Sequence, residues 1–147
     1  MKNTLDNLEL YCQGINNNGR YSFDHWIAYL DDDPFGFLMT SPVEPSDGDE
    51  LDKWCIEGKK TSTLDLLIGN PKYLGKGLSV AMIRAFIRDK FSDYDFFIID
   101  PEVSNTRAIH VYQKAGFRVQ GEFCPSFNPI PHLMMRLAVV DLVNERD

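Results

Sequence analysis

The sequence contains a glycine-rich turn, Tyr73-Leu74-Gly75-Lys76-Gly77-Leu78-Ser79, between a predicted strand and a predicted helix. Glycines in such a turn allow positive φ angles, and the free N–H groups of the first helical turn can bind an anion such as a pyrophosphate. The turn fits neither the dinucleotide fingerprint, which has three spaced glycines, nor the Walker A pattern, which ends in Gly-Lys-Ser/Thr. Its neighbours in the chain must therefore indicate which ligand it serves.

The elements on either side of this turn form a crossover connection. Residues 61–68 are predicted to form a strand whose second half is apolar except for Asp65, as in a strand buried on both faces. After the turn, apolar side chains recur at helical spacing, at Leu78, Met82, Ile83, Phe86 and Ile87. Residues 95–100 give a second buried strand, which Pro101 ends. This order of strand, turn, helix and strand predicts two parallel strands.

The residues before the crossover predict a short helix and a hairpin. Leu5, Leu8 and Tyr11 or Cys12 fall at helical spacing, which favours a helix at the N-terminus. Two β-prone runs, 25–30 and 35–40, flank a turn at residues 31–34 and indicate an antiparallel hairpin. We interpret the three aspartates of that turn as solvated, because a calcium loop needs further ligands at defined offsets.

A loop-rich region at residues 41–58 connects the hairpin to the crossover. Trp54 and Ile56 suggest that part of it packs back on the body of the protein, and loops of this length are often functional. Its acidic side chains could face a cationic ligand or form a solvated edge: Glu44, Asp47, Asp49, Glu50, Asp52 and Glu57.

The residues after the crossover predict a helix and two strands. Ser104 or Asn105 is suited to cap a helix, and Gly116 is suited to end it. Strand-like patterns follow at 117–123 and 132–139. We therefore predict a single α/β domain over residues 1–147, built around a mixed sheet.

Composition limits the classes of partner. The chain has 15 Lys and Arg against 22 Asp and Glu, a net charge of −7, which disfavours nucleic acid and suits a cationic substrate or simple solubility. Three scattered cysteines indicate no disulfide framework and no zinc site, which points to a reducing cytoplasm. The first ten residues carry Asp6 and Glu9, unlike a usual signal peptide, and no apolar run reaches the ~20 residues of a membrane span.

Two segments carry a family resemblance. They are the turn at 73–79 and, later, Asn105-Thr106-Arg107-Ala108-Ile109-His110-Val111-Tyr112-Gln113-Lys114-Ala115-Gly116-Phe117. In this order they resemble the GNAT superfamily of acetyl-CoA-dependent N-acetyltransferases. The run from Asp65 to Phe117 is most similar to the branch of aminoglycoside 6′-N-acetyltransferases and siderophore-lysine acyltransferases, which also carry Leu-Gly-Lys-Gly-Leu, here 74–78, and Asp-Pro, here Asp100-Pro101.

The resemblance implies a mixed, mostly antiparallel sheet with a central splayed parallel pair, flanking helices and a shortened N-terminus. It implies acetyl-CoA as cosubstrate, bound by the glycine turn, the backbone of the strand before it and the start of the later helix. The residues concerned are Leu67, Ile68, Leu74, Gly75, Lys76, Gly77, Leu78, Ser79, Asn105 and Ala108. Leu74 stands where the superfamily usually has Arg or Gln, and Ser79 where Gly or Ala is usual, so we expect the pyrophosphate to be held mainly by backbone N–H groups.

The resemblance also implies catalytic roles. Asp65, the lone carboxylate of an apolar strand, is expected to accept the amine's proton directly or through water, or to anchor the substrate ammonium; the alternative is a solvated edge. Tyr112 is expected to protonate the leaving thiolate, unless it is a core aromatic. Glu57 and Asp100, with Asp65, are expected to bind the acceptor. The three histidines lack metal-ligand spacing, and no metal is predicted.

The function expected is acetyl transfer to a primary amine of a small cationic acceptor, aminoglycoside-like, by direct transfer within a ternary complex. Such an activity would confer antibiotic resistance. One alternative is a siderophore hydroxylysine N-acyltransferase, and another is a degenerate module that binds acyl-CoA without turnover. A homodimer could supply walls of the acceptor pocket that a short N-terminus does not.

Overall fold

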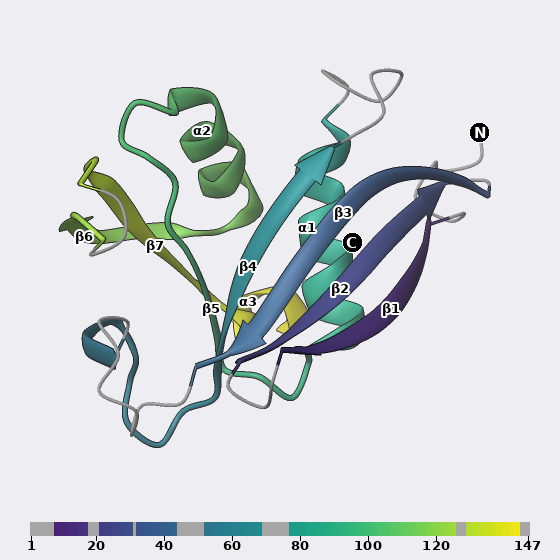
Figure 1. The fold of residues 1–147 in the computed structure, drawn as a ribbon, viewed down its shortest axis with the longest axis horizontal. Helices are drawn as coiled ribbons and strands as arrows, with labels where there is room; N and C mark the ends of the chain where they lie inside the picture. The colour runs from purple at the N-terminus through teal and green to yellow at the C-terminus, as the bar shows by residue number, and fades with distance from the viewer. Residues whose placement is uncertain are drawn as a thin grey trace.

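The structure is a computed structural model, and it describes residues 8–17, 21–30, 32–43, 52–68, 77–125 and 129–144. One sheet of seven strands has the order β1-β2-β3-β4-β5-β7-β6 (Figure 1). Its strands are β1 (Leu8–Asn17), β2 (Tyr21–Leu30), β3 (Asp33–Pro42), β4 (Thr61–Ile68), β5 (Phe96–Ile99), β6 (Arg118–Phe123) and β7 (His132–Ala138). The helices are α1 (Leu78–Lys90), α2 (Thr106–Ala115), α3 (Val139–Asn144) and the 3₁₀ turn η3 (Asp52–Trp54).

The predicted fold class is confirmed. Strands β4 and β5 pair in parallel, and the other neighbours in the described sheet pair antiparallel. The predicted hairpin is β2 and β3, with a shorter turn than expected because β3 already begins at Asp33, opposite Leu30. Asp32 occupies this turn with a φ of 65°, a left-handed conformation that Asp tolerates better than most residues.

The prediction of an N-terminal helix was wrong. Leu8–Asn17 is strand β1, which pairs with β2 along its whole length, from Leu8 opposite Leu30 to Asn17 opposite Tyr21. A continuous ladder pairs the backbone groups of the segment that face β2, and this tertiary pairing outweighs a weak helical spacing. Residues before Leu8 lie outside the described part of the chain.

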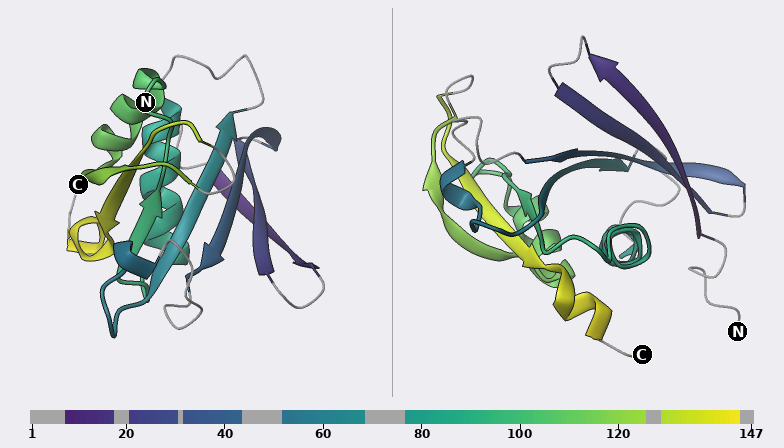
Figure 2. Two further views of the ribbon diagram at one scale, coloured as in Figure 1. Left: turned by 60° about the vertical axis from the view of Figure 1, so that its left-hand side comes forward. Right: turned by 90° about the horizontal axis from the view of Figure 1, so that it is seen from below.

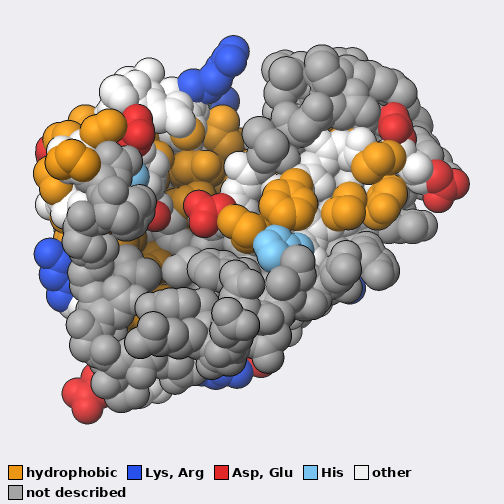
Figure 3. Space-filling view, in the orientation of Figure 1, with side chains coloured by type: hydrophobic (Ala, Val, Ile, Leu, Met, Phe, Trp, Pro, Cys, Tyr) orange, Lys and Arg blue, Asp and Glu red, His pale blue; other side chains and the backbone are white. Residues whose placement is uncertain are grey.

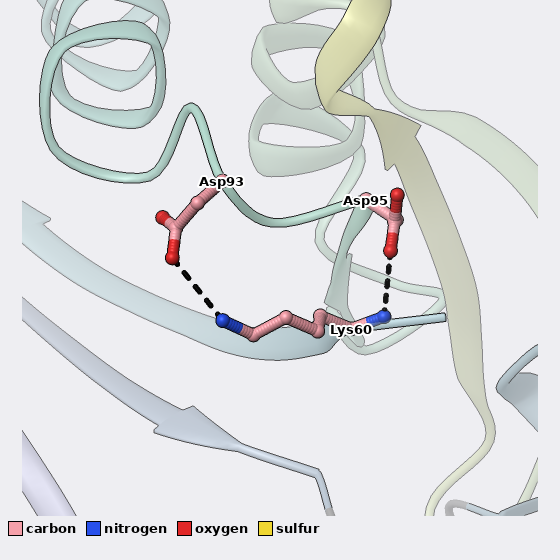
Figure 4. Close-up of polar contacts among 3 residues, drawn as sticks. All are labelled: Lys60, Asp93 and Asp95. Atoms are coloured by element: carbon pink, nitrogen blue, oxygen red, sulfur yellow. Dashed lines mark hydrogen bonds and ion pairs between the residues drawn. The ribbon is translucent and has the colours of Figure 1, made fainter. Parts of the chain in front are cut away.

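Strands β4 and β5 are fixed together at one end and separate at the other. The Lys60 N–H donates to the Asp95 carboxylate at 2.8 Å (Figure 4). In addition, the N–H groups of Asp95 and Phe96 donate to the Lys60 carbonyl at 2.9 and 3.0 Å. The Lys60 ammonium adds an exposed ion pair to Asp93 at 3.1 Å. We call this group of residues, Lys60, Asp93 and Asp95, the β4–β5 bracket.

Beyond the bracket the parallel pairing is short. It runs from Thr61 opposite Phe96 to Thr63 opposite Ile98, and β4 then continues to Ile68 without pairing to β5. The two strands diverge in Figure 1, with the rest of β4 held by β3. The splayed parallel pair that the resemblance implied is therefore present. We call the region in which β4 and β5 diverge without pairing the wedge.

Helix α1 covers one face of the sheet, as the view along its axis shows (Figure 2). The predicted apolar stripe is buried, with Met82, Ile83, Phe86 and Ile87 at 0% exposure. Gly36 of β3 permits this close packing, because a Cβ there would lie 2.8 Å from the Met82 sulfur. Phe91, just after α1, packs edge-on against the rings of Trp26, Phe86, Tyr94 and Phe97 at 5.0 to 5.8 Å.

The C-terminal part differs from the prediction in one element. Strands β6 and β7 are close to the predicted bounds, but Val139 begins helix α3 instead of ending a strand. In the 41–58 region, Trp54 packs on Phe123 with ring centroids 5.7 Å apart, as expected. Ile56 is 38% exposed, so Trp54 is the residue that carries this packing.

Candidate active site

Strand β4 presents Asp65 on the sheet face opposite α1. Leu64 is 1% exposed in the core with the α1 side chains, and side chains alternate along a strand, so its neighbour Asp65 points to the other face. Asp65 stands opposite Met39 of β3, which stands opposite His25 of β2. Figure 3 views this face and shows an acidic side chain beside hydrophobic side chains and a histidine, in a hollow between the two halves of the molecule.

Three predicted residues come together around the wedge. Asp65 lies on β4, Asp100 directly follows β5, and Tyr112 lies on α2. Loss of solvent around the Asp65 carboxyl group, followed by the negative charge of Asp100, raises the pKa of Asp65 to about 6. Asp65 is exposed, so an acceptor can reach its carboxyl group from solvent.

The same two carboxylates also affect the pKa of Tyr112. Burial raises its pKa above the ordinary value, and the charges of Asp65 and Asp100 add to the effect because a phenolate beside them would be repelled. Its ring packs against Phe117 at 6.1 Å, so the side chain is both part of the packing and part of the site. A phenol with a raised pKa keeps its proton at neutral pH, which a proton donor requires.

His132, the first residue of β7, is an addition that the sequence did not indicate. Its Nδ1–H donates to the Asp100 backbone carbonyl at 2.8 Å, and the same nitrogen lies 3.3 Å from the Asp100 carboxylate. The side chain is buried. In the sequence, the three histidines show only a lack of metal-ligand spacing. Thirty-two residues separate it from Asp100, so only the folded chain reveals the contact.

The N-terminus of α1 can accept an anion. Gly77 precedes the helix with a φ of 71°, no side chain caps the helix, and its first turn carries no acidic residue. A Cβ at Gly77 would meet no atom within 4 Å among the described residues, so space adjoins the helix start. Leu78 and Ser79 form the first turn, whereas Leu74, Gly75 and Lys76 lie outside the described part of the chain.

The remaining predicted cofactor residues lie on the two sides of the wedge. Leu67 and Ile68 belong to the portion of β4 that continues past its pairing with β5. On the other side, the Asn105 side chain accepts a hydrogen bond from the Ala108 N–H at 3.2 Å and so caps α2, as predicted. Gly116 ends this helix with a φ of 117°.

Glu57 is not brought to this cluster. It lies in an exposed turn before β4, at the end of that strand where the β4–β5 bracket is found. Across the described ranges, no three His, Cys, Asp or Glu side chains are arranged to hold a metal ion. The helices in those ranges are also too short or too polar to cross a membrane.

The arrangement offers a definite chemistry. Two carboxylates can bind an ammonium group, the one with the raised pKa can take a proton from it, and the phenol can supply a proton nearby. The open helix N-terminus and the unpaired side of β4 can hold an extended phosphate-bearing ligand that reaches this cluster through the wedge.

Comparison with known proteins identifies the family. The sequence profile described as the acetyltransferase (GNAT) domain matches residues 2–124. The aminoglycoside N(6′)-acetyltransferase type 1 of Klebsiella pneumoniae is 34% identical over 113 residues, which are 74% of this chain and 54% of that protein, so the chain spans about half of that relative's length.

Solved structures agree. The aminoglycoside N(6′)-acetyltransferase of Legionella pneumophila is 47% identical with a TM-score of 0.73, over 84% of this chain and 67% of that one. AAC(6′)-Ib in complex with coenzyme A and kanamycin is 28% identical with a TM-score of 0.69, over 84% of this chain and 72% of that one. The chain therefore belongs to the GNAT acetyltransferase family.

Proposed function

We propose that this protein is an acetyl-CoA-dependent N-acetyltransferase that acts in the cytoplasm on a primary amine of a small cationic, aminoglycoside-like acceptor. The observation that carries the proposal is the electrostatic cluster of Asp65, Asp100 and Tyr112 beside the wedge between β4 and β5. Transfer is direct, within a ternary complex.

The described residues offer groups that could bind acetyl-CoA on both sides of the wedge. The N–H groups at the start of α1, after Gly77, would bind its pyrophosphate, and the backbone of Leu67 and Ile68 would pair with the pantetheine arm. Asn105 and Ala108 border the other side of the wedge. When bound, acetyl-CoA supplies the acetyl group as a thioester with an electrophilic carbonyl carbon.

Asp65 and Asp100 prepare the acceptor. A free alkyl amine has a pKa of about 10.4, so removing its proton at pH 7 costs roughly 4 to 5 kcal/mol. Two adjacent carboxylates attract the ammonium group, and Asp65, with a pKa of about 6, is a better proton acceptor than an ordinary aspartate. Asp65 takes the proton directly or through a water, and the nitrogen lone pair can then form the C–N bond.

Tyr112 completes the proton balance. As the C–S bond breaks, the sulfur leaves as a thiolate, and the Tyr112 phenol donates its proton there. The burial that raises the pKa of Tyr112 keeps this proton in place until it is needed. The ammonium group gives up two protons in all. The first goes to Asp65 before attack, and the phenol proton of Tyr112 goes to the thiol product. The second nitrogen proton, released as the tetrahedral intermediate collapses, returns to the Tyr112 phenolate directly or through a water.

The relatives support this choice of acceptor. Proteins named as aminoglycoside 6′-acetyltransferases match both in sequence and in structure, and a protein of Rhizobium radiobacter named as a kanamycin resistance protein is 37% identical over 73 residues. A polyhydroxylated acceptor with several ammonium groups also suits a chain with a net charge of −7.

A thiol-release assay tests the proposal. The protein is mixed with acetyl-CoA and, in turn, with kanamycin, spermidine and a hydroxylamino-lysine. Turnover with kanamycin is expected; turnover confined to the hydroxylamine would indicate the siderophore activity instead. Thermal stabilisation by acetyl-CoA without thiol release from any amine would indicate a binding module. The Asp65→Asn variant, which keeps the shape but cannot take a proton, should bind acetyl-CoA normally and lose most of its turnover.

A further inference from the structure

The segment directly after Asp100, residues 101–103, is bonded to the start of β7. The Leu133 N–H donates to the Pro101 carbonyl at 2.9 Å, the Val103 N–H donates to the Pro131 carbonyl at 3.0 Å, and Glu102 forms an isolated bridge with His132. The segment after β5 is thus fixed by main-chain bonds on both sides of His132. The imidazole of His132 extends from this paired segment back to Asp100.

The geometry defines which nitrogen carries the proton. A carbonyl oxygen can only accept, so Nδ1, at 2.8 Å from the Asp100 carbonyl, must be the donor. The Asp100 carboxylate lies 3.3 Å from the same nitrogen, so the N–H dipole also lies close to the negative charge of Asp100. Nε2 is buried without a hydrogen-bond partner in the described part of the protein, so a second proton there would have no acceptor.

A pure packing role does not account for these facts. His132 is 7% exposed and packs near Phe123, with ring centroids 6.1 Å apart. An apolar ring in the same place would bury no unsatisfied polar atom. Burying an unpartnered ring nitrogen costs free energy. The compensating interaction is the Nδ1–H contact with Asp100.

We propose that His132 is a positioning residue for acetyl transfer, which holds the Asp100 carboxylate in its anionic form and directs it toward the acceptor amine. This inference rests on the proposed function, because it assigns a role within that site. His132 contacts Asp100 and acts through it, so it is distinct from Asp65 and Tyr112, which exchange protons with the reactants.

The ionisable groups around Asp100 determine the direction of the effect. Asp65 faces it from β4, Tyr112 faces it from α2, and Glu102 follows it on its own segment. Asp65 and Asp100 repel each other when both are ionised. The Nδ1–H group partly offsets the cost of a negative charge on Asp100, so its loss should raise the pKa of Asp100.

The first test is a titration of the free protein. Carbon-13 NMR of the aspartate carboxyl groups is recorded against pH for the wild type and for His132→Phe, His132→Asn and His132→Gln. Asn places an amide N–H near the position of Nδ1, whereas the Gln amide reaches one methylene further, toward the position of Nε2. We expect the pKa of Asp100 to rise in the Phe and Gln variants and to stay near the wild-type value in the Asn variant.

The second test uses activity. At pH values below the midpoint, kcat/KM should fall more steeply in His132→Phe, because Asp100 as well as Asp65 then takes up a proton within the assay range. This extra loss should be absent when the same change is made in an Asp100→Asn background. A lower rate with an unchanged pH dependence in every variant would show that His132 only supports the fold. If His132→Phe does not fold, the difference between the Asn and Gln variants decides the question.

The two tests also separate this inference from the proposed function. If no amine is acetylated, the proposed function fails, while the NMR titration still measures the coupling of His132 to Asp100. An unchanged Asp100 titration in an active enzyme would overturn the inference alone.

Discussion

Replacing Asp100 by Asn should move the acidic limb of the pH–rate profile to lower pH. The substitution keeps the size and shape of the side chain and removes one negative charge next to Asp65. Because that charge helps to raise the pKa of Asp65, a neutral neighbour lets Asp65 lose its proton more readily. The acceptor also loses one anchor, so the maximal kcat/KM falls even as its midpoint shifts.

The size of the shift follows from the two causes of the raised pKa. The pKa of Asp65 is about 6, compared with an ordinary 3.8, so it lies about two pH units higher. Desolvation is the larger cause and the charge of Asp100 the smaller. Removing Asp100's charge should therefore reverse less than half of the difference, and the midpoint should fall by less than about one pH unit.

The assay is kcat/KM for the best acceptor between pH 4.5 and 8, which reports the free enzyme. Asp93→Asn is the control, since Asp93 lies in the exposed β4–β5 bracket, paired with Lys60, and its charge should not affect the midpoint. Salt should reduce the difference between Asp100→Asn and wild type, because part of Asp65 reaches solvent. A midpoint that stays in place or rises would refute the assigned repulsion between Asp65 and Asp100.

Three further changes, one of them with a matched control, test other parts of the site and the fold. Tyr112→Phe should lower kcat and leave acetyl-CoA affinity nearly unchanged, because only the proton donor is removed; an undiminished rate would exclude Tyr112 as the acid. Gly77→Ala should destabilise the protein by about 1 kcal/mol, from its φ of 71°, and also weaken acetyl-CoA binding measured by calorimetry. Gly58→Ala, with a φ of 80° and open space around it, should show the same loss in Tm with no loss of binding. Phe91→Ala should lower the free energy of unfolding by about 3 to 5 kcal/mol in urea titration, because Phe91 is 8% exposed and contacts four aromatic rings; a loss below about 1 kcal/mol would contradict its central place in the core.

The elements with strong local signals were predictable from sequence. Helix α2 has an Asn cap and a glycine stop, and α1 has a buried apolar stripe, so both were found close to their observed bounds. Strand β1 was missed because its residues also fit a helical spacing, and only pairing with β2 decides between the two. Helix α3 was missed because Val139 and Val140 continue the β-prone pattern of β7 without an evident turn.

The candidate site was predictable only in part, because some of its contacts join distant segments of the chain. Asp65 was noticeable as a charge in an apolar strand, and Tyr112 and Asp100 entered through the family resemblance. His132 carried no local signal, since its contact with Asp100 depends on the antiparallel pairing of β7 with β5 and the bridge to Glu102. Contacts between distant segments are set by the register of strands, which a single sequence does not contain.

The β4–β5 bracket gives the wedge a fixed apex. Lys60, Asp95 and Phe96 join the two strands at that end, while β3 holds the far side of β4 and β7 holds the far side of β5. Because both strands are held on their far sides, we expect them to stay apart whether or not a ligand is bound. Alternate amides of residues 64–68 should accordingly differ in deuterium exchange: those bonded to β3 should exchange slowly, and those facing the wedge should exchange rapidly until a ligand occupies it.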